Sequence, residues 1–392
     1  MLNGPFSPWP SFTQEEAEAV QRVLLSNKVN YWTGQEGREF EREFAAFAGT
    51  DHAVAVANGT VALDLALRGL GIGEGDEVMV TSRTFLASVS SIVMAGAVPV
   101  FADVDRDSQN ITPETVAEQI TPRTRAIMAV HLAGWPCEMD GLMALAEQRG
   151  LYVIEDCAQA HGATYKGRSV GSIGHVGAWS FCQDKIMSTG GEGGMVTTND
   201  RELWSRMWSY KDHGKSWEAV YEREHPPGFR WLHESFGTNW RLTEMQSAIG
   251  RIQLERMPAW TAARRANAER IWAAASQCDG LRVPSVPEEI GHAAYKCYLY
   301  VEPTALKPGW DRDRIMQTIR AEGVPCMSGS CSEVYREKAF DNTGWRPEEP
   351  LPVARELGET SLMFLCHPTL KDEEVDKTCR VLGDVMAEAA AS

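Results

Sequence analysis

Short apolar stretches alternate with amphipathic segments through the first 200 residues of the chain. The apolar stretches are short and contain many β-branched residues, which is typical of buried strands. We predict strands over 53–57, 77–81, 98–102, 126–131, 152–155, 177–181 and 194–198. The segments between them, such as 61–70 and 139–149, have helical periodicity. This alternation predicts an α/β fold built on a mostly parallel sheet.

The pattern changes after residue 242. Residues 242–274 predict long helices that leave the first domain and are broken at Pro258. A further apolar segment at 293–301 and helices over 312–322 and 371–390 then suit a smaller α+β domain. We therefore expect a large domain over 1–250, whose N-terminal segment can pack elsewhere, and a small domain over 251–392.

Charge and composition exclude several kinds of partner. The chain has 392 residues and a net charge of −16, which gives no general attraction to nucleic acid or to an anionic membrane. The longest uncharged stretch, 84–102, contains Gly96 and Pro99 and predicts a helix, a turn and a strand rather than a membrane span. The nine cysteines lack metal-ligand spacing, and the N-terminus lacks a signal-peptide pattern. We expect reduced thiols, no metal and a cytoplasmic protein.

Two segments place candidate ligand-binding residues at strand ends. Asn58, Gly59 and Thr60 end one strand and begin an apolar helix, so their backbone N–H groups suit a phosphate, although an ordinary helix cap would look the same. Asp156 ends another apolar strand and is followed by Gln159. An aspartate there stays ionised beside a cation such as a protonated pyridine nitrogen, or it simply caps the strand.

Two later segments add an amine and an amide. Lys185 follows the buried strand that contains Ser180 and precedes the glycines of 190–194. A lysine beside apolar surface loses its proton more easily and forms a Schiff base with an aldehyde, whereas most lysines are simply solvated. Asn239 lies at the start of a helix after a long loop, where a cap is the alternative role.

Taken in order, these four segments resemble the DegT/DnrJ/EryC1/StrS family of pyridoxal-phosphate-dependent sugar aminotransferases. The resemblance runs from Tyr31 to Pro368. It implies a fold-type-I aminotransferase with a mixed seven-stranded sheet flanked by helices and a smaller α+β C-terminal domain. It also implies pyridoxal 5'-phosphate as cofactor and a homodimer whose active sites are shared between subunits.

The resemblance also assigns roles to individual residues. Lys185 is similar to the lysine that binds the cofactor covalently and then moves protons, and Asp156 to the partner of the pyridine nitrogen. Gln159 matches the residue against the hydroxyl face of the ring, and Phe85 the aromatic side chain that stacks on it. The family's phosphate contacts match Gly59, Thr60, Ser180 and, from the other subunit, Asn239.

The substrates are less closely defined. By resemblance the amino donor is glutamate, and the segments around Lys185 are most similar to enzymes that aminate carbon 8 of an oxidised 3-deoxy-octulosonate for lipopolysaccharide. A nucleotide-linked keto sugar is the alternative acceptor. The long segment 211–236 carries cations and an aromatic residue that could bind a sugar acid, unless it is a solvated surface loop. The substrate residues we expect there are His213, Lys215, Arg230 and Trp231, with Lys211 as a further candidate cation.

Two other functions remain as alternatives. Some members of this family carry histidine in place of the lysine and remove a hydroxyl group, so Lys185 favours transamination over dehydration. A regulator that binds the cofactor without catalysis is the second alternative. The chain carries no appended basic helix-turn-helix module, and it keeps both Lys185 and Asp156.

Overall fold

A seven-stranded sheet forms the centre of the molecule. The computed structural model describes residues 5–225, 227–228 and 230–391. In spatial order, the strands of the large sheet are β1 (His52–Val56), β9 (Gly194–Thr198), β8 (Val176–Ser180), β5 (Tyr152–Asp156), β4 (Thr124–Val130), β2 (Glu77–Thr81) and β3 (Val98–Ala102). They are the seven strands predicted from the apolar pattern, with ends shifted by one or two residues at most. The α/β class and the mixed sheet are confirmed.

The direction of the strands decides where a site can form. The neighbours β3, β2, β4, β5 and β8 pair in parallel, while β9 runs antiparallel to both β8 and β1. Consequently β1, β2, β5 and β8 all point the same way. The chain segments that leave these four strands therefore meet at one edge of the sheet, which is where open α/β sheets bind ligands.

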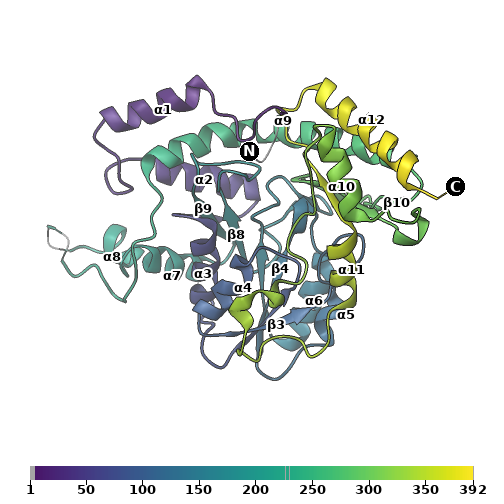
Figure 1. The fold of residues 1–392 in the computed structure, drawn as a ribbon. Helices are drawn as coiled ribbons and strands as arrows, with labels where there is room; N and C mark the ends of the chain where they lie inside the picture. Colours follow the sequence, from purple (N-terminus) through teal and green to yellow (C-terminus); the bar gives the residue numbers. More distant parts are fainter. Residues whose placement is uncertain (1–4, 226, 229, 392) are drawn as a thin grey trace.

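Helices enclose the sheet and connect it to the rest of the chain (Figure 1). The helices are α1 (Gln14–Leu25), α2 (Glu36–Ala48), α3 (Gly59–Gly69), α4 (Ala87–Met94), α5 (Pro113–Ala117), α6 (Met139–Arg149), α7 (Arg201–Lys211), α8 (Trp217–Tyr221), α9 (Glu244–Ala275), α10 (Arg312–Ala321), α11 (Pro352–Thr360) and α12 (Asp372–Ala389). In Figure 1, α8 and the chain beyond it project from one side of the molecule.

The predicted break at Pro258 is wrong. Residues 244–275 form a single helix, α9, with Pro258 in its interior. Proline removes one backbone hydrogen bond from a helix and usually kinks it. Here α9 packs against α1, α2 and α12, and buried residues such as Leu254 and Met257 flank the proline. Packing on several sides compensates for the missing hydrogen bond.

A smaller sheet forms the C-terminal part of the molecule. Its strands, in spatial order, are β10 (Leu281–Arg282), β12 (Cys297–Val301), β14 (Ser361–Phe364) and β13 (Cys326–Met327), with α10 and α12 packed against its apolar residues. The N-terminal segment also packs here: the N–H of Ser7 donates to Glu374 at 2.6 Å, and Thr369 donates to the carbonyl of Pro8 at 2.8 Å. The expected domain boundary at residue 250 falls inside α9, so the division at that residue remains a proposal.

A third, three-stranded sheet connects the two parts. It consists of β11 (Ile290–Gly291), β6 (Thr164–Tyr165) and β7 (Arg168–Ser169). It joins the chain beyond β5 to the segment that leads into β12. Among the described residues, no helix combines the length and the apolar character needed to cross a membrane.

Candidate active site

The four strands that point the same way deliver their following segments to one cavity. This cavity has a volume of about 590 Å³ and lies at the carboxyl edge of the large sheet. It receives Asn58 beyond β1, Thr84 beyond β2, Asp156 from β5 and Ser180 from β8. Seven of the predicted cofactor residues line it: Gly59, Thr60, Phe85, Asp156, Gln159, Ser180 and Lys185.

One end of the cavity is suited to an anion. Asn58 caps α3 by accepting a hydrogen bond from the N–H of Val61 at 2.9 Å, which leaves the start of the helix open toward the cavity. Helix N-termini bind phosphate through their unpaired N–H groups and the helix dipole. A Cβ atom at Gly59 would lie 2.5 Å from Cβ of Ser180, so the close approach of β8 to this helix requires glycine.

Asp156 is fixed in position by two donors. Its side chain is buried, with Oδ2 accepting from the hydroxyl of Ser88 at 2.7 Å and Oδ1 from the N–H of Ala158 at 3.1 Å. Ser88 lies on α4 and also shares a 2.9 Å hydrogen bond with Thr84. A buried carboxylate held in this way faces the cavity with its orientation already set. Ser88 was not expected at this site from the sequence.

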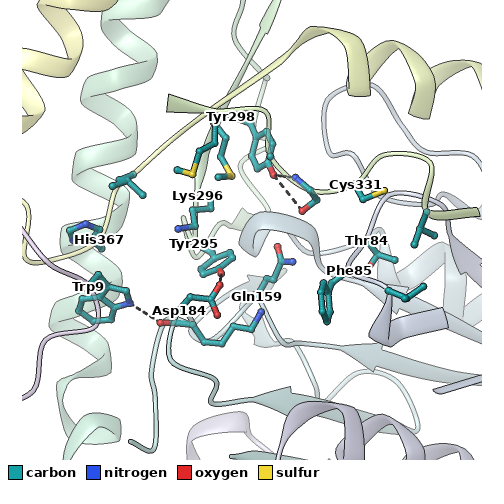
Figure 2. A pocket seen from close by; sticks show the side chains of 18 of the residues that line it. Trp9, Thr84, Phe85, Gln159, Asp184, Tyr295, Lys296, Tyr298, Cys331 and His367 are labelled. Carbon is teal, nitrogen blue, oxygen red and sulfur yellow. Dashed lines mark hydrogen bonds between the residues drawn. The ribbon is translucent and has the colours of Figure 1, made fainter. Parts of the chain in front are cut away.

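Gln159 and Phe85 line the cavity together with Lys185, and Figure 2 shows these first two side chains close to each other. The side-chain oxygen of Gln159 accepts from the N–H of Ala133 at 2.9 Å, so its amide nitrogen remains available to a ligand. Phe85 is 70% exposed, which is unusual for a phenylalanine in a folded chain. An exposed aromatic ring beside a cavity provides a flat surface on which another ring can stack.

Lys185 is held by contacts on both sides of its backbone. The indole N–H of Trp9 donates to its carbonyl at 2.8 Å, so the N-terminal segment reaches the site. The neighbouring Asp184 accepts from the hydroxyl of Tyr295 at 2.5 Å. Burial opposes ionisation of Asp184, but the charge of Lys185 and the Tyr295 hydrogen bond outweigh it and lower the pKa of Asp184. No local pattern pointed to Trp9 or Tyr295, because both lie far from Lys185 along the chain.

The other predicted residues do not line this cavity. Asn239 is exposed and forms an isolated backbone bridge with Asp212 beyond α7. His213, Arg230 and Trp231 are also exposed on the projecting part of the chain, and Trp231 is 81% exposed. In this single chain the structure therefore brings together the residues expected from one subunit, but not Asn239.

Lys211 and Lys215 differ from the free surface cations that the sequence suggested. Lys211 is fully buried and forms an ion pair with Glu41 at 2.9 Å. Lys215 is also buried, with its amine 2.8 Å from the carboxylate of Asp212 and 4.4 Å from the ring centre of Trp32. Glu41 is distant from Lys211 in sequence, whereas Asp212 lies three residues before Lys215. The composition of the loop does not reveal either pairing. Both lysines stabilise the start of the projecting segment.

A buried cluster below the sheet edge has the residue types of a metal site. The potential ligand atoms of His131, Glu155 and Cys157 lie within 4.8 Å of one another. Protein donors already occupy both carboxylate oxygens of Glu155: His131 at 2.9 Å and the backbone N–H groups of Gly171, Ile173 and Gly174 at 2.6–2.8 Å. This hydrogen bonding lowers the pKa of Glu155 even though burial acts to raise it. The cluster is a structural network that fixes the segment after β5.

The residues of the cavity fit pyridoxal 5'-phosphate. The open start of α3 suits the phosphate, Asp156 a protonated ring nitrogen, Phe85 the ring face and Lys185 the aldehyde. The crowded contact between Gly59 and Ser180 leaves the backbone, rather than a side chain, at the phosphate end.

Comparison with known proteins agrees with this geometry. Residues 10–383 match the model of the DegT/DnrJ/EryC1/StrS aminotransferase family. The chain is 35% identical to the spore coat polysaccharide biosynthesis protein SpsC of Bacillus subtilis, covering 97% of this chain and 96% of that protein. It is 36% identical to a UDP-N-acetyl-3-dehydro-alpha-D-glucosamine 3-aminotransferase of Acidithiobacillus ferrooxidans, covering 97% and 95%.

Solved structures have the same fold along nearly the whole chain. An aminotransferase from Psychrobacter cryohalolentis superposes with a TM-score of 0.96 at 65% identity, covering 98% of this chain and 99% of that one. DesV of S. venezuelae superposes with a TM-score of 0.85 at 35% identity, covering 94% of both chains. With the cavity at the sheet edge, these matches show that the chain belongs to the DegT/DnrJ/EryC1/StrS aminotransferase family and is a pyridoxal-phosphate-dependent aminotransferase.

Proposed function

We propose that this aminotransferase moves an amino group from glutamate to a carbonyl group of a sugar. The observation that carries the proposal is the meeting of Lys185, Asp156 and the open start of α3 in one cavity. The acceptor class is supported by the relatives, which include a UDP-sugar 3-aminotransferase, a dTDP-sugar transaminase and GDP-perosamine synthases.

When bound, the cofactor supplies an electron-withdrawing ring that stabilises negative charge on the substrate carbon. Asp156 would face the ring nitrogen with its carboxylate already oriented, because Ser88 and Ala158 hold it in place. Lys185 would hold the cofactor through its amine, and the same nitrogen, when free, could accept and return a proton. Phe85 and Gln159, which both line the cavity, would hold the ring.

For the acceptor, we favour a 3-deoxy-octulosonate oxidised at carbon 8, a sugar acid of lipopolysaccharide. The support is the resemblance of the segment Phe181–Met187 and the glycines after it to enzymes of that branch. The names of the curated relatives instead support a nucleotide-linked keto sugar. The two acceptors differ chemically, since the first carries a carboxylate and the second a diphosphate.

We also propose a homodimer in which Asn239 reaches the phosphate of the partner's cofactor. Asn239 is exposed on the projecting segment and does not line its own cavity, so it is available to a second subunit. Exposed apolar side chains on the same segment, Trp231 at 81% and Phe236 at 99%, are suited to burial against another copy.

Purified enzyme tests this function directly. Glutamate added to the cofactor-loaded protein should shift its absorbance as the amino group moves to the cofactor. A panel of the octulosonate aldehyde, a UDP-linked and a dTDP-linked keto sugar should then reverse the shift for the true acceptor. The absence of any glutamate-dependent shift would refute glutamate as donor, and reversal by a nucleotide sugar alone would refute the sugar acid.

A further inference from the structure

A second chamber opens from the cofactor cavity toward the C-terminal sheet (Figure 2). It also has a volume of about 590 Å³, and it shares Thr84, Phe85, Gln159, Asp184 and Lys185 with the first cavity. Beyond these residues its walls come from the N-terminal segment, from β12 and from the segments beside β13 and β14. Because the two cavities share Lys185, a substrate that reacts there has room to extend into the chamber.

Lys296 is an unpaired cation in the wall of this chamber. It is partly buried, and among the described residues it forms no hydrogen bond or ion pair. Its amine lies 4.9 Å from the ring centre of Tyr295, while the amine of Lys185 lies 5.5 Å from the same ring. In Figure 2, Tyr295 lies between Lys296 and Asp184. Both amines therefore lie close to the same aromatic ring in the wall of the chamber.

The acidic groups of the chamber do not neutralise Lys296. Asp184 already accepts the hydroxyl of Tyr295 and lies beside Lys185, and Glu337 is exposed. Burial lowers the pKa of Lys296 to about 8; the charges of Arg264 and Lys185 also lower it, while Asp184 and Cys366 act to raise it. A partly buried amine with this balance of charges lacks an anionic partner.

Arg264 of α9 adds a second uncompensated positive charge behind the chamber wall. It is 1% exposed, and its Nε and one Nη atom have no hydrogen-bond partner. Its guanidinium lies 4.7 Å from the ring centre of Trp9, which lines the chamber. Burial lowers the pKa of His367, also in the wall, to about 3, and both Arg264 and Lys296 contribute to that shift. The surroundings of the chamber are therefore electropositive.

We propose that Lys296 binds a substrate carboxylate that is remote from the reacting carbon. The α-carboxylate of an amino donor is bonded to the reacting carbon and must lie beside Lys185, whereas Tyr295 lies between Lys296 and Asp184, the residue next to Lys185 (Figure 2). A carboxylate at the far end of the substrate meets this requirement. Two substrates of the proposed function have one: the sugar-acid acceptor and, through its side chain, glutamate. This inference rests on the proposed function for the choice of substrates.

The test compares Lys296→Met with Lys296→Arg and with the surface control Lys166→Met. Methionine keeps most of the length of the side chain and removes its charge, while arginine keeps the charge. For the acceptor, calorimetry on the cofactor-loaded enzyme measures the affinity for 3-deoxy-octulosonate and for its methyl ester. For the donor, absorbance measures the half-reaction with glutamate and with alanine, which has no second carboxylate.

Loss of a charge-assisted hydrogen bond should weaken the carboxylate ligand about tenfold to a hundredfold. We expect Lys296→Met to weaken the acid but not the ester, Lys296→Arg to recover part of the loss, and Lys166→Met to change neither. Weakened use of glutamate alone, with alanine unaffected, would place the donor's side chain at Lys296 instead. Equal effects on acid and ester and on both donors, or no effect at all, would overturn the inference.

The outcome is separate from that of the proposed function. If the unmodified enzyme neither binds nor aminates the sugar acid, the proposed acceptor is wrong whatever the variants do. The role of Lys296 is then decided by the ratio of glutamate to alanine activity. An unchanged ratio in Lys296→Met would overturn it, and a ratio lowered at least tenfold would support it.

Discussion

The substitution Asp156→Asn separates the chemical role of this residue from its structural one. Asparagine keeps the shape and one carbonyl oxygen, so it can still accept from the N–H of Ala158, now 3.1 Å from the carboxylate. Its NH₂ group would face Ser88, whose hydroxyl can accept that hydrogen bond while donating to Thr84 at 2.9 Å. Since both contacts survive, the free energy of unfolding should change by no more than about 1.5 kcal/mol.

The charge has no such substitute. Asp156 is buried, so its interaction with a protonated ring nitrogen is weakly screened. A contact between opposite unit charges at an effective dielectric of about 20 contributes about 4 kcal/mol. If that contribution is lost from the transition state, the step that removes the substrate proton slows by about a thousandfold.

The assay follows absorbance after glutamate is mixed with cofactor-loaded enzyme, and melting temperature reports the fold. Ser88→Ala is the matched control, because it removes one donor to Asp156 but keeps the charge. We expect a loss of about tenfold for Ser88→Ala and about a thousandfold for Asp156→Asn. A folded Asp156→Asn enzyme with nearly normal rates would refute the assignment and leave Asp156 as a strand-end cap.

Three further predictions concern the amine, the dimer and pH. Borohydride reduction of the yellow holoenzyme followed by peptide mapping should label Lys185, and a label on any other lysine would contradict its role. Lys185→Ala and Asn239→Ala proteins that are mixed and refolded should regain part of the activity, because one site of each mixed dimer keeps both residues. No recovery, despite proven exchange of subunits, would place Asn239 in the active site of its own subunit. Lys296 is charged below its pKa of about 8 and neutral above it, so kcat/KM for a carboxylate-bearing acceptor should fall as pH rises through about 8. The fall should be absent in Lys296→Arg, and its persistence there would assign it to another group.

The residues of the cofactor cavity could be predicted because each lies next to its own strand. The pattern around β1, β5 and β8 identified Gly59, Asp156 and Lys185, and parallel strand ends then bring such residues to one edge. The local sequence was therefore enough to predict both the strand and the position of the functional residue next to it. Pro258 misled us for the opposite reason, since the stability of α9 depends on helices from distant parts of the chain.

The rest of the site depends on contacts between distant segments. Trp9 reaches the carbonyl of Lys185 across 176 residues, and Tyr295 reaches Asp184 across 111. Lys215 shows that sequence can also suggest a role that tertiary structure removes. The composition of its loop suggested a free cation, but in the structure its amine is paired with the carboxylate of Asp212. A charge becomes available to a substrate only when folding leaves it unpaired, and pairing is a property of tertiary structure.

The residues at the edge of the large sheet and those from distant segments of the chain suit two different requirements of a two-stage reaction, chemistry on the cofactor and recognition of the substrates. Chemistry on the cofactor is the same for donor and acceptor, and the groups proposed to perform it all come from the edge of one sheet. Recognition must admit two different substrates in turn, and the walls that face them come from the N-terminal segment and the C-terminal sheet. Lys185 and Asp184 are common to both cavities, so either substrate reaches the same amine. Substitutions at the sheet edge should therefore slow both half-reactions alike, whereas substitutions in the second chamber should act on one substrate and spare the other.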